Sequence, residues 1–347
     1  MTRIHRDLDA RKPSGMSTTI FEAPQEKAPS VVSIATLNID TLPKDTVLNL
    51  SLRLTHNALS EISVPILAYR SPKPGPTIGV VCAIHGNEIN GIPVIQKLFQ
   101  EIREGKKILQ CGSIIGVLVL NIPGFLESER GQDGQDLNRL MPGKASGTAP
   151  QQYAFRVFHE IVMKFDYLVD LHTASRGRKN SLYVRADMNQ PTIKQMACAL
   201  QPQIIVHNSS PTGSVRGCAQ SKGIHAVTIE IGDCSVFQSD LIDATFEGLC
   251  AAFSSIGVMS GEYETVSRST HQCERSYWIF SRQAGILRVY RGLAEKLERG
   301  SIIAEIQSIF GEVLETIYAP NDYDTVVIHL GVIGNNFSTT PVDDGHL

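Results

Sequence analysis

Apolar strands that alternate with amphipathic helices are the feature of this sequence that most constrains its fold. The run from Ile78 to Ile84 is apolar along almost its whole length, as in a strand that is buried on both faces. Apolar residues then recur at helical spacing from Ile92 to Ile102, and a second apolar run follows at 114–120. This order predicts an α/β fold with a mostly parallel sheet and helices on both faces.

The same alternation continues to about residue 254. We expect strands at 49–55, 63–70, 167–171, 204–207 and 226–231, and helices at 153–165, 192–200 and 240–254. Residues 1–45 contain four prolines and no sustained period, which predicts a partly ordered arm. The domain prediction is therefore an arm at 1–45, an α/β domain at 46–261 that would carry the active site, and a small all-β domain at 262–347 that would wall the cleft.

Composition excludes several classes of protein. The 347 residues carry 32 basic and 35 acidic side chains, a formal charge of −3, which argues against a surface that coats nucleic acid. The apolar runs are much shorter than the roughly 20 residues that span a bilayer, so no membrane helix is expected. The charged first residues resemble no export signal, and the seven cysteines form no Cys-x-x-Cys pair. These features predict a reduced, cytoplasmic protein.

Potential metal ligands follow the predicted strands at their carboxyl ends. His85 and Glu88 come directly after one apolar strand, His172 ends another, and Glu230 lies near the end of a third. Since ligands bind beyond the carboxyl ends of strands in open α/β sheets, these side chains are expected to converge. Two imidazoles and one carboxylate match a catalytic zinc site with an open fourth position, one zinc ion per chain. Glu230 is then left as a general base.

Each of these residues also has an ordinary structural interpretation. A single His-x-x-Glu is common by chance, and a histidine or glutamate at a strand end is often only hydrogen-bonded or solvated. The joint placement of the three segments favours the metal site. His207, which also ends a predicted strand, is the reserve ligand. Asp170, two residues before His172, is placed to orient a ligand imidazole, although a loop-capping role is equally compatible with its position.

A second polar cluster follows the strand at 114–120. Arg139 and Asn138 are suited to hold a substrate carboxylate, and Arg130 is suited to polarise a carbonyl oxygen. A solvated loop with unremarkable arginines is the alternative. Other arginines that could contact an anion are Arg176, Arg178 and Arg216, each with a surface role as the simpler interpretation.

Four motifs together resemble the succinylglutamate desuccinylase/aspartoacylase family, whose fold is similar to that of zinc carboxypeptidases. They are His85-Gly86-Asn87-Glu88, Asp136-Leu137-Asn138-Arg139 with Pro142-Gly143, Asp170-Leu171-His172-Thr173 and Thr228-Ile229-Glu230-Ile231-Gly232. The resemblance implies zinc on His85, Glu88 and His172. It also implies Glu230 as the base, Arg139 and Asn138 on the substrate carboxylate, and Arg130 at the carbonyl.

The resemblance spans about residues 48 to 330 and has two departures. Asn121-Ile122-Pro123 stands where the family usually has Asn-Pro, and Met141 replaces the usual aromatic residue before Pro-Gly, which bears on where Arg130 lies. The C-terminal region resembles a barrel-sandwich domain of the biotinyl/lipoyl kind, without the exposed lysine that a carrier would need. It is expected to wall the cleft, where Tyr318 and Tyr323 are candidates to reach the site.

The function expected from these features is zinc-dependent amide hydrolysis. The substrate would be a small molecule, an N-acyl amino acid or a related carboxylate-bearing amine that loses an acetyl- or succinyl-type group by Glu230-assisted attack of zinc-bound water. A zinc carboxypeptidase and a non-catalytic binding protein with the same fold are the alternatives. A serine hydrolase is disfavoured, because no Gly-x-Ser-x-Gly elbow is present. No nucleic acid or membrane partner is expected, and a homo-oligomer is left open.

Overall fold

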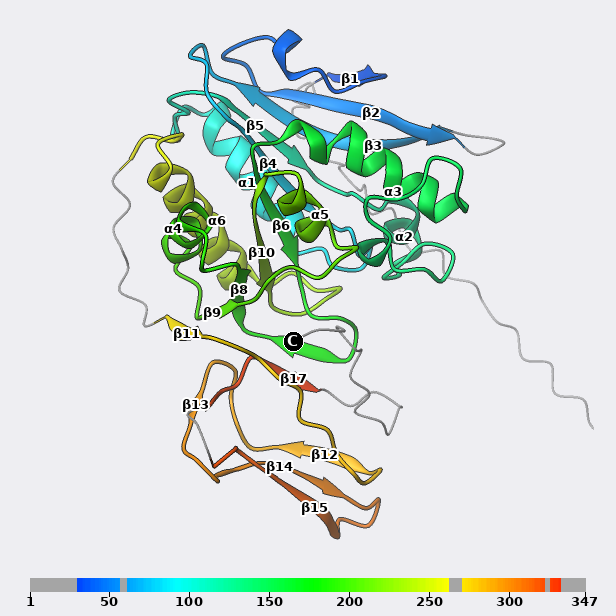
Figure 1. The fold of residues 1–347 in the computed structure, drawn as a ribbon, viewed down its shortest axis with the longest axis vertical. Coiled ribbons are helices and arrows are strands. Elements are labelled where there is room, and N and C mark those ends of the chain that lie inside the picture. The colour runs from blue at the N-terminus through cyan, green and yellow to red at the C-terminus, as the bar shows by residue number, and fades with distance from the viewer. Residues whose placement is uncertain (1–29, 57–60, 262–269, 322–324, 332–347) are drawn as a thin grey trace, which may run out of the picture. The chain divides into compact units, whose positions relative to one another are not determined.

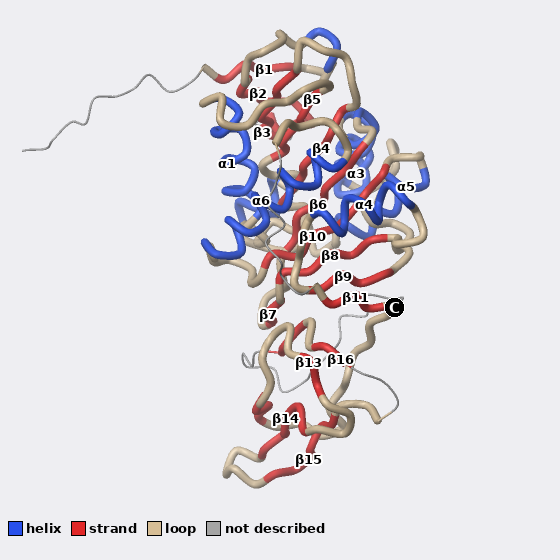
Figure 2. Tube along the Cα trace, turned by 90° about the vertical axis from the view of Figure 1, so that its left-hand side faces the viewer, coloured by secondary structure: helices blue, strands red, loops and turns tan. Residues whose placement is uncertain are grey.

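The main sheet combines a parallel centre with antiparallel additions. The structure, a computed structural model, describes residues 30–56, 61–261, 270–321 and 325–331. In sheet order the ten strands are β1 (Val31–Ile34), β2 (Leu48–His56), β3 (Glu61–Arg70), β5 (Ser113–Val117), β4 (Thr77–Cys82), β6 (Tyr167–His172), β10 (His225–Ile231), β8 (Leu182–Ala186), β9 (Ile204–His207) and β11 (His271–Cys273). Figure 2 shows these strands following one another across the sheet.

The four central strands, β5, β4, β6 and β10, are parallel to one another. Strand β8 pairs antiparallel with β10, and β3 pairs antiparallel with β5. The fold class predicted from the sequence is thus confirmed: an α/β protein with a mostly parallel sheet between helices. Strand β8 was not predicted, because its sequence Leu-Tyr-Val-Arg-Ala is neither fully apolar nor strictly alternating.

Helices cover both faces of the sheet (Figure 1). One hydrophobic cluster contains residues of α1 (Gly91–Arg103), α4 (Pro191–Ala199) and α6 (Ser239–Ser255), and another contains residues of α3 (Ala149–Glu160) and α5 (Val215–Ser221). The short helix α2 (Ile122–Glu127) follows β5. Short 3-10 turns complete the helical elements: η1 (Ile39–Thr41), η2 (Leu137–Arg139) and η3 (Val162–Lys164). None of the described helices is long and apolar enough to cross a membrane.

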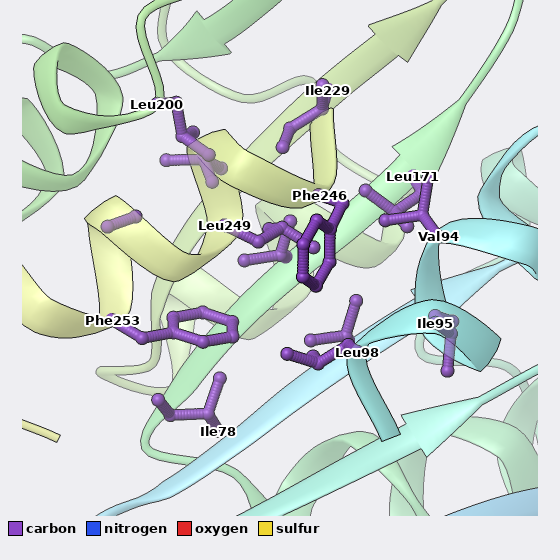
Figure 3. Close-up of a cluster of buried hydrophobic side chains, with 14 of the residues drawn as sticks. Ile78, Val94, Ile95, Leu98, Leu171, Leu200, Ile229, Phe246, Leu249 and Phe253 are labelled. Atoms are coloured by element: carbon purple, nitrogen blue, oxygen red, sulfur yellow. The ribbon is translucent and has the colours of Figure 1, made fainter. Parts of the chain in front are cut away.

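The core beneath the central strands explains why the helices form where they do. Helix α1 buries Val94, Ile95 and Leu98 on one stripe, and α6 buries Phe246 and Phe253. Figure 3 shows these side chains packed together with residues of β4, β6 and β10. This packing fixes the strand ends from which the polar residues project.

Small antiparallel sheets make up the C-terminal region. The strands β12 (Ile286–Val289), β14 (Ile302–Gln307) and β15 (Val313–Tyr318) form one sheet, and β13 (Lys296–Leu297) pairs with β16 (Thr325–Val326). The last strand, β17 (His329–Gly331), returns to pair with β7 (Arg178–Asn180), just after β6 (Figure 1). Strand β11 joins the main sheet through β9. The domain boundary at residue 261 stays a prediction. The described part of the predicted arm, residues 30–45, contains β1 and η1. Residues 1–29 of the arm lie outside the described part.

Candidate functional site

His85, Glu88 and His172 meet at the carboxyl ends of β4 and β6. His85 and Glu88 lie in the turn between β4 and α1, and His172 is the last residue of β6. Nδ1 of His85 lies 2.8 Å from Oε1 of Glu88 and 3.2 Å from Nδ1 of His172, and Nδ1 of His172 lies 2.9 Å from Oε2 of Glu88. All three side chains are buried. Within the described ranges it is the one group of three or more histidine, cysteine, aspartate or glutamate side chains that are close enough together to hold a metal ion.

The geometry and charge of this cluster suit a divalent cation such as zinc. In a tetrahedral zinc site with bonds of about 2.0–2.1 Å, neighbouring ligand atoms lie about 3.3 Å apart, close to the 3.2 Å between the two imidazole nitrogens. Three carboxylates, on Glu88, Asp136 and Asp170, contact the two imidazoles, and the guanidinium of Arg130 contacts two of them, Glu88 and Asp136. Oδ1 of Asp170 is buried and has no hydrogen-bond partner among the residues that the structure describes. A bound cation would offset this negative charge.

Carboxylates behind the two imidazoles set their orientation. Nε2 of His172 lies 3.0 Å from Oδ2 of Asp170, and Nε2 of His85 lies 3.1 Å from Oδ1 of Asp136. Since an ionised carboxylate only accepts hydrogen bonds, each Nε2 carries the proton and each Nδ1 is left as a ligand atom. Asp170 therefore lies where the sequence placed it. Asp136, for which no such role was predicted, orients the other imidazole.

The pKa shifts of the carboxyl groups follow from this arrangement. Burial alone would raise the pKa of Glu88, but the charges of His85 and His172 in their protonated form, and the hydrogen bonds from their rings, lower it well below its usual range. Burial would likewise raise the pKa of Asp136, and His85 and Arg130 lower it. Both carboxyl groups are therefore ionised at neutral pH.

Gly86 allows the metal-ligand turn to approach α2 closely. A Cβ atom at this position would lie 2.0 Å from the backbone carbon of Gly124, and the backbone N–H of Gly86 donates to the carbonyl oxygen of Arg130. Glycine is required at this turn because the two backbones approach each other closely. The positions of His85 and Glu88 in the turn depend on this approach.

Arg130 lies beside the metal-ligand cluster. Its guanidinium donates to Oδ2 of Asp136 at 3.0 Å, to Oε1 of Glu88 at 3.2 Å and to Oγ of Ser175 at 2.9 Å. These contacts fix the guanidinium at the edge of the pocket that contains His85 and His172. The position is compatible with a role at a carbonyl oxygen of the substrate.

Glu230 faces the same pocket from the neighbouring strand. In the parallel pairing of β10 with β6, Glu230 is the register partner of His172. Its Oε2 accepts a hydrogen bond from Nδ2 of Asn180 at 3.0 Å, and its Oε1 lies 3.8 Å from Nε of Arg185. The carboxylate thus lies in the pocket without being part of the metal-ligand group.

Cations dominate the rest of the pocket. Five arginines line it: Arg130, Arg139, Arg178, Arg185 and Arg216. Arg139 is exposed and donates to the carbonyl oxygen of Asn138, whereas Arg216 is buried and donates to Asn208. Burial, together with the nearby charge of Arg185, lowers the pKa of Arg216 to about 10. This lining favours an anionic ligand.

Asn138 is held in place by the first residue of α5. Its Oδ1 accepts the backbone N–H of Val215 at 2.8 Å, at the start of α5. The side-chain amide that lines the pocket is therefore anchored by its oxygen, which leaves Nδ2 as the end suited to donate to a ligand.

Several candidate residues from the sequence lie elsewhere. His207 contacts the backbone N–H of Met188 and the side chain of Asn189, and it is absent from the pocket lining within the described ranges. Arg176 donates to the carbonyl oxygen of Ser128, and Tyr318 is exposed on β15. Tyr323 lies outside the described residues.

Three residues that line the pocket were not predicted from the sequence: Asn180, Arg185 and His329. They lie on β7, β8 and β17, and His329 reaches the site only because β17 pairs with β7. No short motif marks these residues. An antiparallel strand predicted at 182–186 would have pointed to Arg185.

Comparison with known proteins identifies a family model that matches residues 74–256, the succinylglutamate desuccinylase/aspartoacylase catalytic domain. A curated relative, the N-alpha-acetyl-L-2,4-diaminobutyric acid deacetylase of Halomonas elongata, is 22% identical over 271 residues, which cover 75% of this chain and 78% of the relative. The matched range contains all the predicted metal ligands and Glu230.

Solved structures with the same fold cover most of the chain. A succinylglutamate desuccinylase from Silicibacter sp. TM1040 aligns with a TM-score of 0.72 and 22% identity, over 85% of this chain and 93% of its own. The product-bound ectoine utilization protein EutE (DoeB) from Ruegeria pomeroyi aligns with a TM-score of 0.72 and 20% identity, over the same shares of the two chains. A succinylglutamate desuccinylase/aspartoacylase from Rhodobacter sphaeroides aligns with a TM-score of 0.73 and 20% identity, over 88% and 95%.

Proposed function

Because this chain belongs to the succinylglutamate desuccinylase/aspartoacylase family, we propose that it is a zinc-dependent amidohydrolase that removes a small acyl group from an N-acyl amino acid or a related carboxylate-bearing amine. One observation carries this proposal. A buried His85–Glu88–His172 cluster opens into a pocket that also contains Glu230 and the arginines. Metal ligands, a base and an anion site are therefore available in one cavity.

Zinc on His85, Glu88 and His172 would act as a Lewis acid toward the amide carbonyl and lower the pKa of bound water to about 7. In this proposal Glu230 accepts a proton from the attacking water and returns it to the leaving amine. Arg130, held by Asp136 and Ser175, donates to the carbonyl oxygen as negative charge develops on it.

The substrate carboxylate is assigned to Arg139 and to Nδ2 of Asn138. A guanidinium matches a carboxylate with two parallel hydrogen bonds, and an amide adds a neutral donor beside it. The named activity of the Halomonas elongata relative, deacetylation of an N-acetylated amino acid, supports this substrate class. A comparison of N-acetyl and N-succinyl substrates distinguishes between the two acyl groups.

The test compares hydrolysis by the zinc-loaded protein across N-acetyl and N-succinyl amino acids and the corresponding carboxamides. We expect hydrolysis of at least one N-acyl amino acid and poor turnover of its carboxamide. Arg139→Lys should reduce turnover of the carboxylate substrate, and Arg176→Lys, on an arginine outside the pocket, is the matched control. Equal turnover of acid and carboxamide would contradict the carboxylate assignment.

Glu230→Gln tests the base. The substitution keeps the shape of the side chain but removes its basicity, so turnover should fall by about a hundredfold or more. Zinc content, measured by metal analysis, should stay near one equivalent, whereas His85→Ala and His172→Ala should lose it. Near-normal turnover of Glu230→Gln, or loss of its zinc, would overturn the proposed mechanism.

A further inference from the structure

A chain of hydrogen bonds joins Arg185 to Glu230 through three intervening side chains. Arg185 donates through Nη2 to the hydroxyl of Tyr183 at 2.8 Å, and this hydroxyl lies 3.2 Å from Nε2 of His329. Nδ1 of His329 contacts Oδ1 of Asn180, and Nδ2 of Asn180 donates to Oε2 of Glu230 at 3.0 Å. The chain therefore runs from a cation to the carboxylate that we assign as the base.

The position of each proton in this chain follows from the chemistry of its ends. An ionised Glu230 only accepts, so the amide nitrogen of Asn180 must face it and the amide oxygen must face His329. Nδ1 of His329 must then carry a proton. In a neutral imidazole Nε2 is left as an acceptor, and it receives the hydroxyl proton of Tyr183.

The surroundings of His329 hold its ring neutral and fixed. Loss of solvent around the ring and the charges of Arg185 and Arg178 lower the pKa of His329 to about 3. The indole of Trp278 stacks on the imidazole, with ring centres 5.1 Å apart and planes inclined by 15°. Rotation of the ring would break these contacts.

Strand pairing sets the contact between His329 and Asn180. The two residues are register partners in the antiparallel pair of β17 and β7. Asn180 in turn lies within reach of Glu230 on β10. A segment near the C-terminal end of the described chain therefore reaches the pocket at a fixed place.

We propose that His329 is a positioning residue, which acts through Asn180 to orient the carboxylate of Glu230 for proton transfer. This inference rests on the proposed function, because it assumes that Glu230 is the base. Donors aligned in one direction along a chain polarise one another, so the hydrogen bond that reaches Glu230 is strengthened. Since His329 acts through the base, its loss should lower kcat and leave KM nearly unchanged.

The first experiment measures the tautomer of His329 and needs no substrate. Long-range ¹⁵N–¹H NMR of the histidine side chains, assigned by comparison with His329→Asn, should show a neutral ring with the proton on Nδ1 at pH 7. A proton on Nε2, or on both nitrogens, would overturn the proposed chain.

The second experiment compares substitutions that remove different parts of the chain. His329→Phe keeps a flat ring but removes both nitrogens, and kcat should fall about tenfold with little change in KM. His329→Asn places an amide near the position of Nδ1, so it should restore part of the loss. His329→Gln places its amide near Nε2 and should not. Tyr183→Phe, one step farther from Glu230 than His329, should have a smaller effect than His329→Phe.

Zinc content and thermal unfolding of each variant, together with Glu230→Gln, separate the possible failures. Normal kcat in His329→Phe while Glu230→Gln is inactive would overturn the positioning role and leave the proposed function intact. Near-normal turnover in Glu230→Gln would overturn both. Loss of zinc in His329→Phe and in His329→Asn would also overturn the positioning role, because it would place His329 in support of the metal cluster.

Discussion

The two imidazoles of the cluster use their nitrogens in the same way. In both His85 and His172, Nδ1 faces the cluster and Nε2 faces a carboxylate. A carboxylate behind a ligand imidazole fixes its tautomer and raises its basicity. The strength of metal binding should therefore depend on residues that never touch the metal.

Asp170→Asn tests this dependence. The substitution removes the negative charge next to Nε2 of His172, so zinc affinity should weaken by about ten- to a hundredfold. Competition with a chelator measures the affinity. Asp243→Asn, at an exposed ion pair with Lys97, is the control and should bind zinc as the wild type does. Unchanged affinity in Asp170→Asn would show that Asp170 does not support the ligand.

The pH dependence of stability should carry a contribution from His329. Its pKa is about 3 in the folded protein, and a histidine in the unfolded chain has a pKa of about 6.5. Between these values the unfolded state binds the additional proton, so stability present above pH 6.5 is lost as the pH falls toward 3. Acidification from pH 7 to pH 5 should lower the free energy of unfolding by about 2 kcal/mol through the protonation of this residue in the unfolded chain.

Comparison with His329→Asn isolates that contribution, since asparagine does not titrate. Denaturant unfolding at pH 7 and pH 5 should show a larger decrease for the wild type than for the variant. Burial of the ring and the charges of Arg185 and Arg178 keep the imidazole neutral. Equal pH dependence in the two proteins would mean that His329 becomes protonated in the folded state near pH 6.5.

At the scale of the elements, the turn between β4 and α1 can be tested through Gly86. A Cβ atom there would lie 2.0 Å from the backbone of α2, so Gly86→Ala must shift either the turn or the helix. We expect zinc affinity and thermal stability to fall together. Gly292→Ala is a matched control, because its added carbon would lie 3.6 Å from the nearest atom, an oxygen of Glu295. Normal zinc binding by Gly86→Ala would show that the turn adapts.

The elements that could be predicted from the sequence are those whose burial determines their residue types. Strands β4 and β6 are buried on both faces and are therefore mostly apolar before their carboxyl ends, and α1 has one apolar stripe. Strands β7 and β17 pair with each other and have only three residues each, Arg-Lys-Asn and His-Leu-Gly. Nothing local in their sequences distinguishes them from loops.

The residues of the site likewise differ in whether the local sequence could predict them. His85, Glu88 and His172 could be predicted because each follows a recognisable strand, and the structure brings them together. Asp136 and His329 could not be assigned, because their roles depend on contacts with residues far away in the sequence. The roles of Glu230, Arg130, Asn138 and Arg139 stay predictions until the variants are measured.

At the scale of the whole molecule, charge is distributed unevenly. The chain has a formal charge of −3, yet five arginines line the pocket. Cations in a pocket raise the local concentration of anionic substrates and increase their association rate. For a substrate with two carboxylates, kcat/KM should therefore fall severalfold between low salt and about 0.5 M salt, because screening shortens the range of the field.

Measurement of kcat/KM over a series of salt concentrations checks this expectation. A substrate analogue with one carboxylate fewer is the control, and it should show a weaker salt dependence. If the two substrates responded equally, attraction by the arginines would not contribute to capture.

The return of β17 to β7 has a consequence for protein synthesis. Residues 85, 88 and 172 emerge from the ribosome well before residue 329. A nascent chain that has folded as far as β10 therefore already contains the proposed metal ligands and Glu230. Until β17 docks, Asn180 lacks its contact with His329. We expect a translation product that stops before β17 to hold zinc if it folds, but to hydrolyse its substrate slowly. Premature termination would then yield a zinc-binding chain of low activity.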